Sequence, residues 1–525
     1  MGWDKETEGI RARREAALAM GGAEAVDRQH GKGRLTVRER IDVLVDEGSF
    51  AEQGPMAGHS EIDDEGRLVE FTPGNYVLGM ARLDGRPCVV GGEDFTLKGG
   101  SPTPAGLRKS VYAEQLAVQY RVPLVRLLEG GGGSVAGTRG GKNAGKGGGG
   151  AHAGDPVYVT PRFMSFAEAM AAVPVVSVAL GPVAGFPAAR LVSSHFSIMV
   201  RDTSQVLIAG PAVVERALGE KKTKEELGGA AVHMHSGVVD NRADDEAGAL
   251  AQVRRFLSYL PTNVWEPAPR VARDDDPARA ESELNSIIPR DRRKAFDIRR
   301  VLELVFDAGS FFEMSAGYGP SQVTGLARLD GQAVGVWAND CRFWAGAMDA
   351  DGAQKARRFI DLCDSFHLPI ISLVDEPGFM IGTGSEAAGT IRYGAQTIFA
   401  ANQSSVPWAA VHLRKAFGVA AAAHFGPESY VLTWPSAESG ALPVEGGVAV
   451  AFGREIAAAD DPDALRSELE EQFAASRTPF PRAESFGVHD LIEPAETRSR
   501  LCRWVEWIQP RLATLVGPTS HSVRP

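Results

Sequence analysis

The sequence is poor in cysteine, with four in 525 residues, and none of them belongs to a CxxC pair. They stand far apart, at Cys88, Cys341, Cys363 and Cys502. This spacing excludes a zinc ribbon and offers no disulfide framework. No apolar run of about 18 residues is present, and the N-terminal segment is charged throughout, so neither a membrane span nor a secretory signal is expected. These absences favour a cytoplasmic protein.

Positive charge is also scarce, because 67 acidic residues outnumber 56 Lys and Arg and give a net charge of −11. That balance argues against a general nucleic-acid binder and against binding to anionic membranes. Aromatic residues make up only 7%, whereas glycine is frequent at 60 positions. Tight turns and close backbone approaches are therefore expected, in a chain long enough for more than one domain.

The chain contains an internal repeat. ARLDGR at 81–86 recurs as ARLDGQ at 327–332, 246 residues later, and RVPLVRLLEGG at 121–131 then aligns with HLPIISLVDEP at 367–377. A second block, 171–185, aligns with 404–418 at a separation of 233 residues. Each copy alternates apolar strands with helical segments, which is typical of layered α/β folds. The sequence predicts two α/β domains, at 1–270 and 285–525, joined by a Pro-, Asp- and Arg-rich linker at 265–282.

Glycine-rich turns follow the buried strands in both copies. One strand in each copy runs into a turn, at 130–134 and at 377–382, and a second strand ends at Gly185 or Gly418. Backbone N–H groups at a strand end or helix start can converge on one oxygen atom and stabilise an oxyanion without a titratable residue. The alternative is that these are only tight turns and close contacts. Because paired glycine turns recur at matching places in both copies, the oxyanion interpretation and the purely structural one are about equally strong.

Other motifs are weaker. Lys142 and Lys146 lie on a glycine-rich insert that nearly spells a phosphate-binding loop but has Gly147 where Ser or Thr is needed. The insert could still contact ligand phosphates, or be a solvated loop. His233 and His235 lack a third metal ligand, so no metal is predicted. Asp375 and Glu376 are adjacent carboxylates, but neighbours on a strand point to opposite faces, so they are not expected to act as a matched pair.

Over most of its length the chain resembles the carboxyltransferase (β) subunit of biotin-dependent acyl-CoA carboxylases, of the propionyl-CoA and methylcrotonyl-CoA carboxylase type. The likeness runs from HGKGRLTVRERI (30–41) to HDLIEPAETRSRL (489–501), and no single motif carries it alone. The most specific segments are MVRDTSQVLIAGPAVV (199–214), KEELGGAAVHMHSGVVDN (224–241), VDEPGFMIGTGSEAAGTIRYGA (374–395) and RKAFG (414–418).

The resemblance implies two tandem crotonase-like (ClpP/crotonase) domains and transfer of a carboxyl group from carboxybiotin to the α, or vinylogous γ, carbon of an acyl-CoA. It implies that each carbonyl that gains negative charge is held by backbone amides, one pair per domain. It also implies a hexamer, a trimer of dimers, with the biotin on a partner chain. A biotin carboxylase and a biotin carboxyl carrier (α) subunit would be those partners, because this chain has no ATP-grasp region and no Met-Lys-Met biotinylation site.

Carried over residue by residue, the resemblance places site residues in both domains. The biotin side would use the amides of Val419 and Ala420, next to Gly418, with Gly378 and Phe379 lining the biotin channel. The acyl-CoA side would use Gly185 and Phe186 for catalysis. Acyl-CoA binding would involve Gly132, Gly133, Lys142, Lys146, Ala421 and Ala422.

This sequence departs from the family pattern in its acyl-CoA half. Pro187 replaces a residue that would carry an N–H, so one donor must come from Phe186, Gly185 or the turn at Gly132–Gly133. Propionyl-type relatives usually place Tyr and Asp at positions matching Ala421 and Ala422. Two methyl groups there predict a wider, less polar acyl pocket and a preference for acyl-CoAs bulkier than propionyl-CoA. The opposing interpretation is that neighbouring side chains refill the space.

Three alternatives to an acyl-CoA carboxylase subunit remain open at this point. The first is the carboxyltransferase chain of a biotin-dependent acyl-CoA decarboxylase, which would have the same site. The second is a crotonase-type hydratase or hydrolase, which would need acid and base carboxylates that the sequence does not place. The third is a non-catalytic scaffold homologue, in whose favour Pro187 is the one feature.

Overall fold

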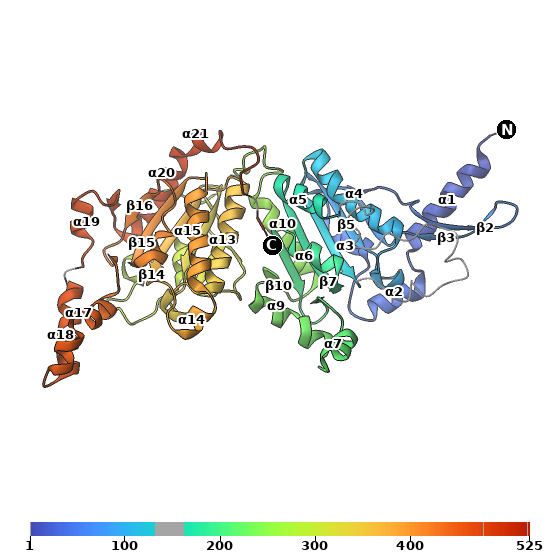
Figure 1. The fold of residues 1–525 in the computed structure, drawn as a ribbon. Helices are drawn as coiled ribbons and strands as arrows, with labels where there is room; N and C mark the ends of the chain where they lie inside the picture. The colour runs from blue at the N-terminus through green and yellow to red at the C-terminus, as the bar shows by residue number, and fades with distance from the viewer. Residues whose placement is uncertain (1, 132–161, 273, 476, 522, 525) are drawn as a thin grey trace. The chain divides into compact units, whose positions relative to one another are not determined.

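The computed structural model describes residues 2–131, 162–272, 274–475, 477–521 and 523–524 (Figure 1). The chain divides into two compact units, residues 1–258 with 523–525, and residues 259–522. Each unit has its own eight-stranded mixed sheet. The predicted Gly132 and Gly133, and the lysines at 142 and 146, lie outside the described residues.

In the first unit the strand order is β1-β4-β5-β6-β7-β8-β10, with β9 paired to β7. The pairs β1–β4 and β4–β5 are antiparallel, and the rest of the sheet is parallel. The strands are β1 (Ala51–Glu52), β4 (Tyr76–Leu83), β5 (Arg86–Glu93), β6 (Leu124–Gly130), β7 (Val175–Ala184), β8 (Phe196–Val200), β9 (Gln205–Leu207) and β10 (Asn241–Ala243), with a separate hairpin of β2 (Gly58–Ile62) and β3 (Leu68–Pro73). The helices are α1 (Asp4–Ala19), α2 (Ala23–His30), α3 (Val37–Leu44), η1 (Lys98–Gly100), α4 (Pro104–Tyr120), α5 (Arg162–Ala172), α6 (Phe186–Val192), α7 (Pro211–Leu218), α8 (Lys224–Gly228), α9 (Ala230–Ser236) and α10 (Glu246–Tyr259).

The second unit repeats this topology in the order β11-β12-β13-β14-β15-β16-β18, with β17 paired to β15. The strands are β11 (Phe312–Met314), β12 (Gln322–Leu329), β13 (Gln332–Asn339), β14 (Ile370–Glu376), β15 (Trp408–Phe417), β16 (Tyr430–Thr433), β17 (Glu438–Gly440) and β18 (Asp490–Leu491). The helices are α11 (Leu284–Ile287), α12 (Ile298–Val305), η3 (Trp344–Gly346), α13 (Ala350–Ser365), α14 (Thr383–Ala387), α15 (Thr390–Gln403), α16 (Gly418–Ala422), α17 (Val444–Ala458), α18 (Pro462–Ala475), α19 (Phe480–Glu484), η4 (Pro494–Glu496), α20 (Thr497–Trp507) and α21 (Gln509–Leu512). The identical strand order confirms the duplication and the α/β, crotonase-like class expected from the sequence.

The repeated LDG turn shows why the copies fold alike. Asp84 and Asp330 both adopt a left-handed backbone, at φ 50° and 49°. In the first unit the Asp46 carboxylate accepts hydrogen bonds from the Asp84 and Gly85 amides, at 3.0 and 2.8 Å. Asp307 does the same for the turn at Asp330, at 3.0 and 2.9 Å. An aspartate and a tight hairpin turn were therefore duplicated as one unit.

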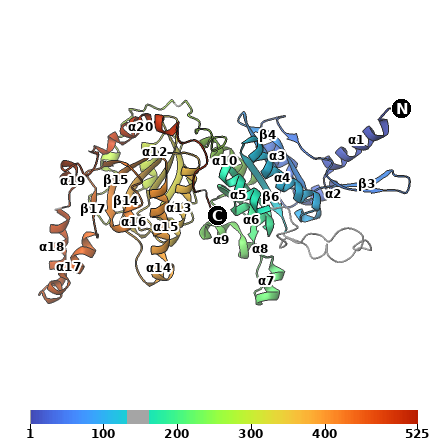
Figure 2. The ribbon, with the colours of Figure 1, turned by 45° about the horizontal axis from the view of Figure 1, so that its top comes forward.

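The central strands form the core. Strands β6 and β14 are buried along their whole length, as are most residues of β7 and β15. Parallel strands covered on both faces read as continuous apolar runs, which is the pattern that the sequence shows at these positions. Helices cover the sheet of each unit, and α16 contacts β14, β15 and α15 in the second (Figure 2).

The segment at 265–282 is not a solvated linker throughout. Arg279 donates to the carbonyl oxygens of Leu304 and Phe306, both at 3.1 Å, and pairs with Asp275. Arg498, 1% exposed, donates to the carbonyl oxygens of Asp275 and Asp276. Arg279 and Asp275 of this segment are therefore packed within the second unit. The boundary between the two compact units lies earlier in the chain, after Ser258. Within the described part of the chain, no helix is long and apolar enough to cross a membrane.

Candidate active site

Three chain segments meet at one corner of each unit. In the first unit they are η1, the end of β6 and the start of α6. A methyl group on Gly100 of η1 would lie 2.7 Å from the Cα of Gly130, and one on Gly130 would lie 3.4 Å from the Pro187 ring. The second unit brings together the corresponding η3, the end of β14 and the start of α16. The corner is therefore duplicated, together with the fold.

The short η1 and η3 segments have an unusual backbone. All three residues of η1 have positive φ, and so do the three residues of η3. Three of these six residues, Lys98 at 53°, Trp344 at 49° and Ala345 at 56°, are not glycine and adopt this conformation at an energetic cost. Sequence reasoning missed this feature, because FTLKGG (95–100) and CRFWAG (341–346) share only their last glycine, although they lie at the repeat separation of 246 residues.

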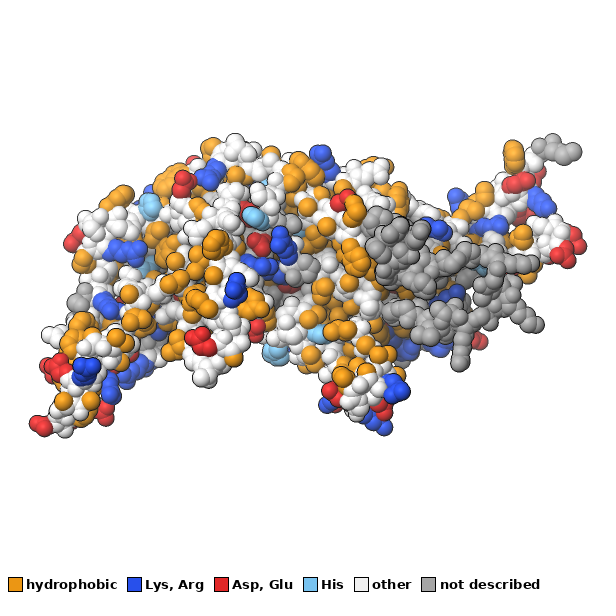
Figure 3. Space-filling model, in the orientation of Figure 1, with side chains coloured by type: hydrophobic (Ala, Val, Ile, Leu, Met, Phe, Trp, Pro, Cys, Tyr) orange, Lys and Arg blue, Asp and Glu red, His pale blue; other side chains and the backbone are white. Residues whose placement is uncertain are grey.

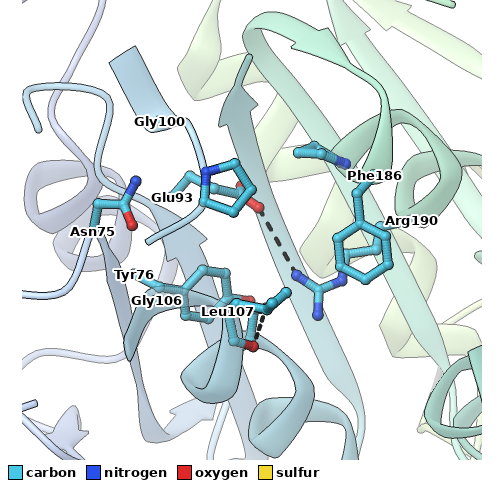
Figure 4. A pocket seen from close by; sticks show the side chains of 11 residues that line it. Asn75, Tyr76, Glu93, Gly100, Gly106, Leu107, Phe186 and Arg190 are labelled. Carbon is cyan, nitrogen blue, oxygen red and sulfur yellow. Dashed lines mark hydrogen bonds and ion pairs between the residues drawn. The ribbon is translucent and has the colours of Figure 1, made fainter. Parts of the chain in front are cut away.

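In the first unit the helix start is built as the sequence expected. Gly185 stands before α6 at φ 65°, a left-handed conformation that favours glycine, and Phe186 is the first helical residue. Pro187 follows and cannot donate a hydrogen bond. Phe186 and Pro187 help to line a cavity of about 20 Å³, enough for one water molecule, and Figure 4 shows Phe186 at its edge. Its lining includes Gly100 and two charged residues, Glu93 and Arg190.

Buried charges surround that cavity. Arg190 lies 4.0 Å from the Glu93 carboxylate, and the two side chains point toward one another in Figure 4. Its Nε donates to Glu114 at 3.1 Å, and its guanidinium stands 4.7 Å from the centre of the Phe186 ring. Burial raises the pKa of Glu93, against the opposing effect of Arg190. Within the described residues the buried Nη2 of Arg190 has no hydrogen-bond partner, and Arg190 lines the cavity.

In the second unit, α16 begins at Gly418, with φ 63°. The first N–H groups of any helix lack intrahelical partners, and here they belong to Gly418, Val419 and Ala420. The side chain of Val419 is 61% exposed, whereas Ala420 is fully buried. The amides of this first turn are therefore carried on a rigidly packed segment with an exposed edge.

The predicted biotin-channel residues lie next to that helix start. Gly378 has φ 126°, and a methyl group on it would lie 3.8 Å from the Phe417 carbonyl oxygen. Phe379 pairs with Met348 in an isolated β-bridge. Its ring rests on Gly394 of α15, where a Cβ atom would lie 2.2 Å from the ring. Gly394 is therefore glycine because the Phe379 ring occupies the space of a side chain.

The adjacent carboxylates at the end of β14 point to opposite faces, as expected. Asp375 accepts two hydrogen bonds from the Arg414 guanidinium, at 3.1 and 2.8 Å. Glu376 instead faces Asn339 and His424 inside the unit. Burial raises the pKa of Glu376 to about 8 and lowers that of His424 to about 3. One signal for this site is present in the sequence, since Glu376 aligns with Gly130 of the other copy.

The two predicted alanines of α16 lie about one turn beyond its start and differ in exposure. Ala421 is 5% exposed and packs in an apolar cluster with Val374, Ala410 and Ala416, while Ala422 is on the surface of its unit. Both ring nitrogens of His233 have partners within the first unit: Nδ1 lies 3.2 Å from Ser236 Oγ and Nε2 lies 2.8 Å from the Val206 carbonyl oxygen. Among the described residues no group of three or more His, Cys, Asp or Glu side chains could hold a metal ion.

Comparison with known proteins points to one family. The family model described as "Carboxyl transferase domain" matches residues 28–513. The chain is 38% identical over 499 residues to the propionyl-CoA carboxylase carboxyltransferase subunit of Haloferax mediterranei, covering 94% of each chain. It is 34% identical to the methylmalonyl-CoA decarboxylase subunit alpha of Veillonella parvula, covering 91% of each.

The fold is also similar to a solved structure, that of transcarboxylase 12S. The TM-score is 0.84 at 32% identity, and the match covers 97% of this chain and 96% of the other. Transcarboxylase 12S assembles as a hexamer, and its structure holds bound methylmalonyl-coenzyme A.

Proposed function

The chain belongs to the carboxyl transferase family, and from this membership we propose that its two units divide one reaction between them. The protein is an enzyme, the carboxyltransferase of a biotin-dependent acyl-CoA carboxylase. The first unit holds the acyl-CoA and the second receives biotin carried by a partner chain. The observation that supports this division is the duplicated corner. Each unit has one helix start there, and the side chains around the two helix starts differ.

On the acyl-CoA side, the chain's task is to hold a thioester carbonyl while negative charge develops on it. Gly185 and Phe186 are our candidates for the backbone donors, because Pro187 has none. The buried Arg190 supports this assignment, since its guanidinium lies against the Phe186 ring and keeps one unpaired donor within the described residues. A fixed positive charge near a developing oxyanion stabilises it most where water is excluded.

On the biotin side, the residues fit a flat ring system held through its carbonyl oxygen. Biotin supplies the carboxyl group when it is bound. The amides of Val419 and Ala420 would hold that carbonyl, with Gly418 leaving room for close approach. Gly378 and Phe379 would flank it, because both lie beside the start of α16 and Phe379 is fixed by Gly394.

We expect that the active site is complete only when several copies of the chain assemble. The described part of the second unit leaves large apolar side chains exposed, among them Ile381 at 84%, Ile391 at 63% and Phe399 at 63%. Orange side chains gather over α13–α15 in Figure 3. Exposed apolar surface of this kind marks interaction sites, and the related transcarboxylase 12S is a hexamer. We propose a hexamer here as well, with biotin carboxylase and biotin carrier chains as partners.

The experiment measures carboxyl transfer from free carboxybiotin to a panel of acyl-CoAs, using the purified chain. We expect transfer without ATP, and no fixation of labelled bicarbonate with ATP until the partner chains are added. ATP-dependent fixation by the isolated chain would overturn the proposal. Arg190→Gln should raise the acyl-CoA KM, while Phe379→Ala should lower kcat with carboxybiotin and leave the acyl-CoA KM near the wild-type value. The opposite pattern would reverse the assignment of the two units.

A second function is worth testing because of one relative. The Veillonella decarboxylase subunit is 34% identical over 91% of both chains, so the same fold also occurs in enzymes named for the reverse direction. Purification of the native complex distinguishes them. Co-purification of a biotin carboxylase supports carboxylation, whereas co-purification of a membrane decarboxylase supports the reverse reaction.

A further inference from the structure

Directly beneath the Gly378 turn, the second unit contains a cluster of polar side chains that is closed to solvent. Its members come from β12, β13, β14 and the segment after Ala422, and each is at most 2% exposed: Gln322, Trp337, Asn339, Ser372, Glu376 and His424. The first unit buries a different, charged set at the matching place: Glu93 and Arg126 stand where Asn339 and Ser372 align, whereas Tyr76 and Gly130 stand where Gln322 and Glu376 align. Polar groups are costly to bury, so a buried carboxyl group at position 376, which the other copy lacks, needs an explanation.

Glu376 is the centre of this cluster, and its two oxygens have different tasks. Oε1 accepts hydrogen bonds from the backbone amides of Gly378 and Met348, at 3.0 and 3.3 Å. The carboxyl group thus ties the Pro377–Phe379 turn to the Met348 segment. Oε2 faces inward and accepts from Asn339 Nδ2 at 3.0 Å and from Gln322 Nε2 at 3.3 Å.

The amide orientations around Glu376 are fixed by chemistry. Asn339 Oδ1 accepts from the Asp375 backbone N–H at 2.9 Å, so its amino group must face Glu376. Gln322 Oε1 accepts from the indole N–H of Trp337 at 2.9 Å, and an indole can only donate. Both amino groups therefore point at the carboxyl group.

The two ring nitrogens of His424 meet different partners. Its Nε2 lies 3.4 Å from Asn339 Nδ2 and 3.6 Å from Glu376 Oε2. Its Nδ1 shares a hydrogen bond with Ser372 Oγ at 2.7 Å, in which the hydroxyl can donate or accept. The ring is stacked on Trp337, with centroids 3.8 Å apart.

One position in the cluster can take an additional proton. Glu376 Oε2 and His424 Nε2 are 3.6 Å apart. When Glu376 is ionised, a neutral His424 can turn Nε2–H toward Oε2 and accept from Ser372 at Nδ1. When Glu376 is protonated, its O–H faces Nε2 and Nδ1–H donates to Ser372, while Asn339 has acceptors in Gln322 Oε1 and the Gly346 carbonyl, both at 3.3 Å. The cluster therefore has two complete hydrogen-bond arrangements that differ by one proton.

From this geometry we propose that Glu376 is a positioning residue for the biotin-side half of the reaction, holding the Gly378 turn through Oε1 and sharing one exchangeable proton with His424 through Oε2. The proposal rests on the assignment of biotin to the second unit. Its consequence is electrostatic: negative charge that develops on a carbonyl held at the start of α16 is opposed by an ionised Glu376 and tolerated by a protonated one. The biotin-side step is then fastest with the pair protonated.

The surroundings make the pair the only titrating unit at this place among the described residues. β12 and β13 contribute neutral Gln322, Trp337 and Asn339, and the Met348 segment contributes a backbone amide. The charged neighbour on β14, Asp375, points to the other face and is paired with Arg414. Burial raises the pKa of Glu376 to about 8, consistent with a proton held by the pair near neutral pH.

Two variants test the proposal in the full chain. Glu376→Gln keeps the acceptor for Gly378 and Met348 and replaces Oε2 by a permanent donor to His424, so it imitates the protonated pair. We expect transfer from carboxybiotin within about threefold of wild type at neutral pH. We also expect loss of the alkaline limb, in which wild-type kcat falls about tenfold per pH unit above the pKa of the pair. His424→Phe keeps the stacking on Trp337 but removes the acceptor, and should move the limb to lower pH.

Infrared difference spectra between about pH 6 and about pH 9 give a readout that does not depend on activity. The wild type should show loss of a protonated-carboxyl band as pH rises, and Glu376→Gln should abolish it, whereas Glu455→Gln, an exposed carboxylate on α17, should match the wild type in both assays. An unchanged alkaline limb in Glu376→Gln, or a band that persists in it, overturns the proposal. If the titration is found but carboxybiotin is not a substrate, the assignment of biotin to this unit has failed instead.

Discussion

Replacing Gly394 by alanine should displace Phe379 and thereby test the biotin side of the site. Alanine at a helical glycine position normally stabilises a protein by about 1 kcal/mol. Here the new Cβ would lie 2.2 and 2.3 Å from two atoms of the Phe379 ring. Ordinary carbon–carbon contact is about 3.7 Å, so the ring must retreat by about 1.5 Å. Overpacking of this kind costs about 1–3 kcal/mol, which cancels or exceeds the helical gain.

The functional effect should be larger than the effect on stability. A misplacement of about 1 Å at a binding group can cost about 10²-fold in rate, so Gly394→Ala should lower kcat with free carboxybiotin by about that factor. The acyl-CoA KM should change little. Gly453→Ala is the matched control, because it also lies in a helix, α17, but its Cβ would meet nothing within 4 Å. That variant should gain stability and keep wild-type activity.

A double-mutant cycle with Phe379→Ala completes the test. If the ring is the target, Phe379→Ala alone should lose a similar factor, and the double variant should lose no more than either single one. The reasoning is refuted if Gly394→Ala folds and retains wild-type kcat, or if its loss multiplies with that of Phe379→Ala.

Three further outcomes are expected. Glu129→Gln should lower the free energy of unfolding by about 3–5 kcal/mol in chemical denaturation, because Glu129 pairs with buried Arg34 and Arg40 at 2.5 Å each, and a loss below about 1 kcal/mol would contradict this. Burial lowers the pKa of His412 to about 4 and that of His424 to about 3, so the unfolded chain binds more protons below about pH 6.5 and stability should fall as pH drops from there toward 4. Thermal melts of His412→Gln should show a shallower fall, and an equal slope would count against it. Ala422→Asp, at an exposed position, should shift kcat/KM toward short acyl-CoAs while leaving the fold intact, and an unchanged ratio across acetyl- to long-chain acyl-CoAs would remove this residue from the pocket.

The structure also changes how the substrate hypothesis is tested. The sequence treats Ala421 and Ala422 alike, but Ala421 is 5% exposed and packed against Val374 and Ala410. A tyrosine there would overpack the core, so Ala421→Tyr would report on stability before it reported on specificity. Ala422 is the informative position, because a side chain added to it meets no core.

The sequence by itself determined the features that depend on local order along the chain. Repeats at separations of 246 and 233 residues predicted two copies of one fold, because a strand, a turn and a helix keep their spacing when duplicated together. Gly185 and Gly418 were identified from the sequence at the two helix starts, since only glycine adopts their left-handed backbone at little cost. Alternation along a strand also placed Asp375 and Glu376 on opposite faces.

Only the tertiary structure decided what each of those residues meets. The partners of Glu376 come from Gln322, Asn339, Met348 and His424, which lie between 28 and 54 residues away along the chain, and no local pattern connects them. The left-handed backbone of Trp344 and Ala345 escaped notice for the same reason, because packing of η3 against the end of β14 imposes it on residues that do not favour it. Spacing records which residues are neighbours in the chain, whereas burial decides which of them must find a hydrogen-bond partner, and that choice is made only when strands distant in sequence close into one sheet.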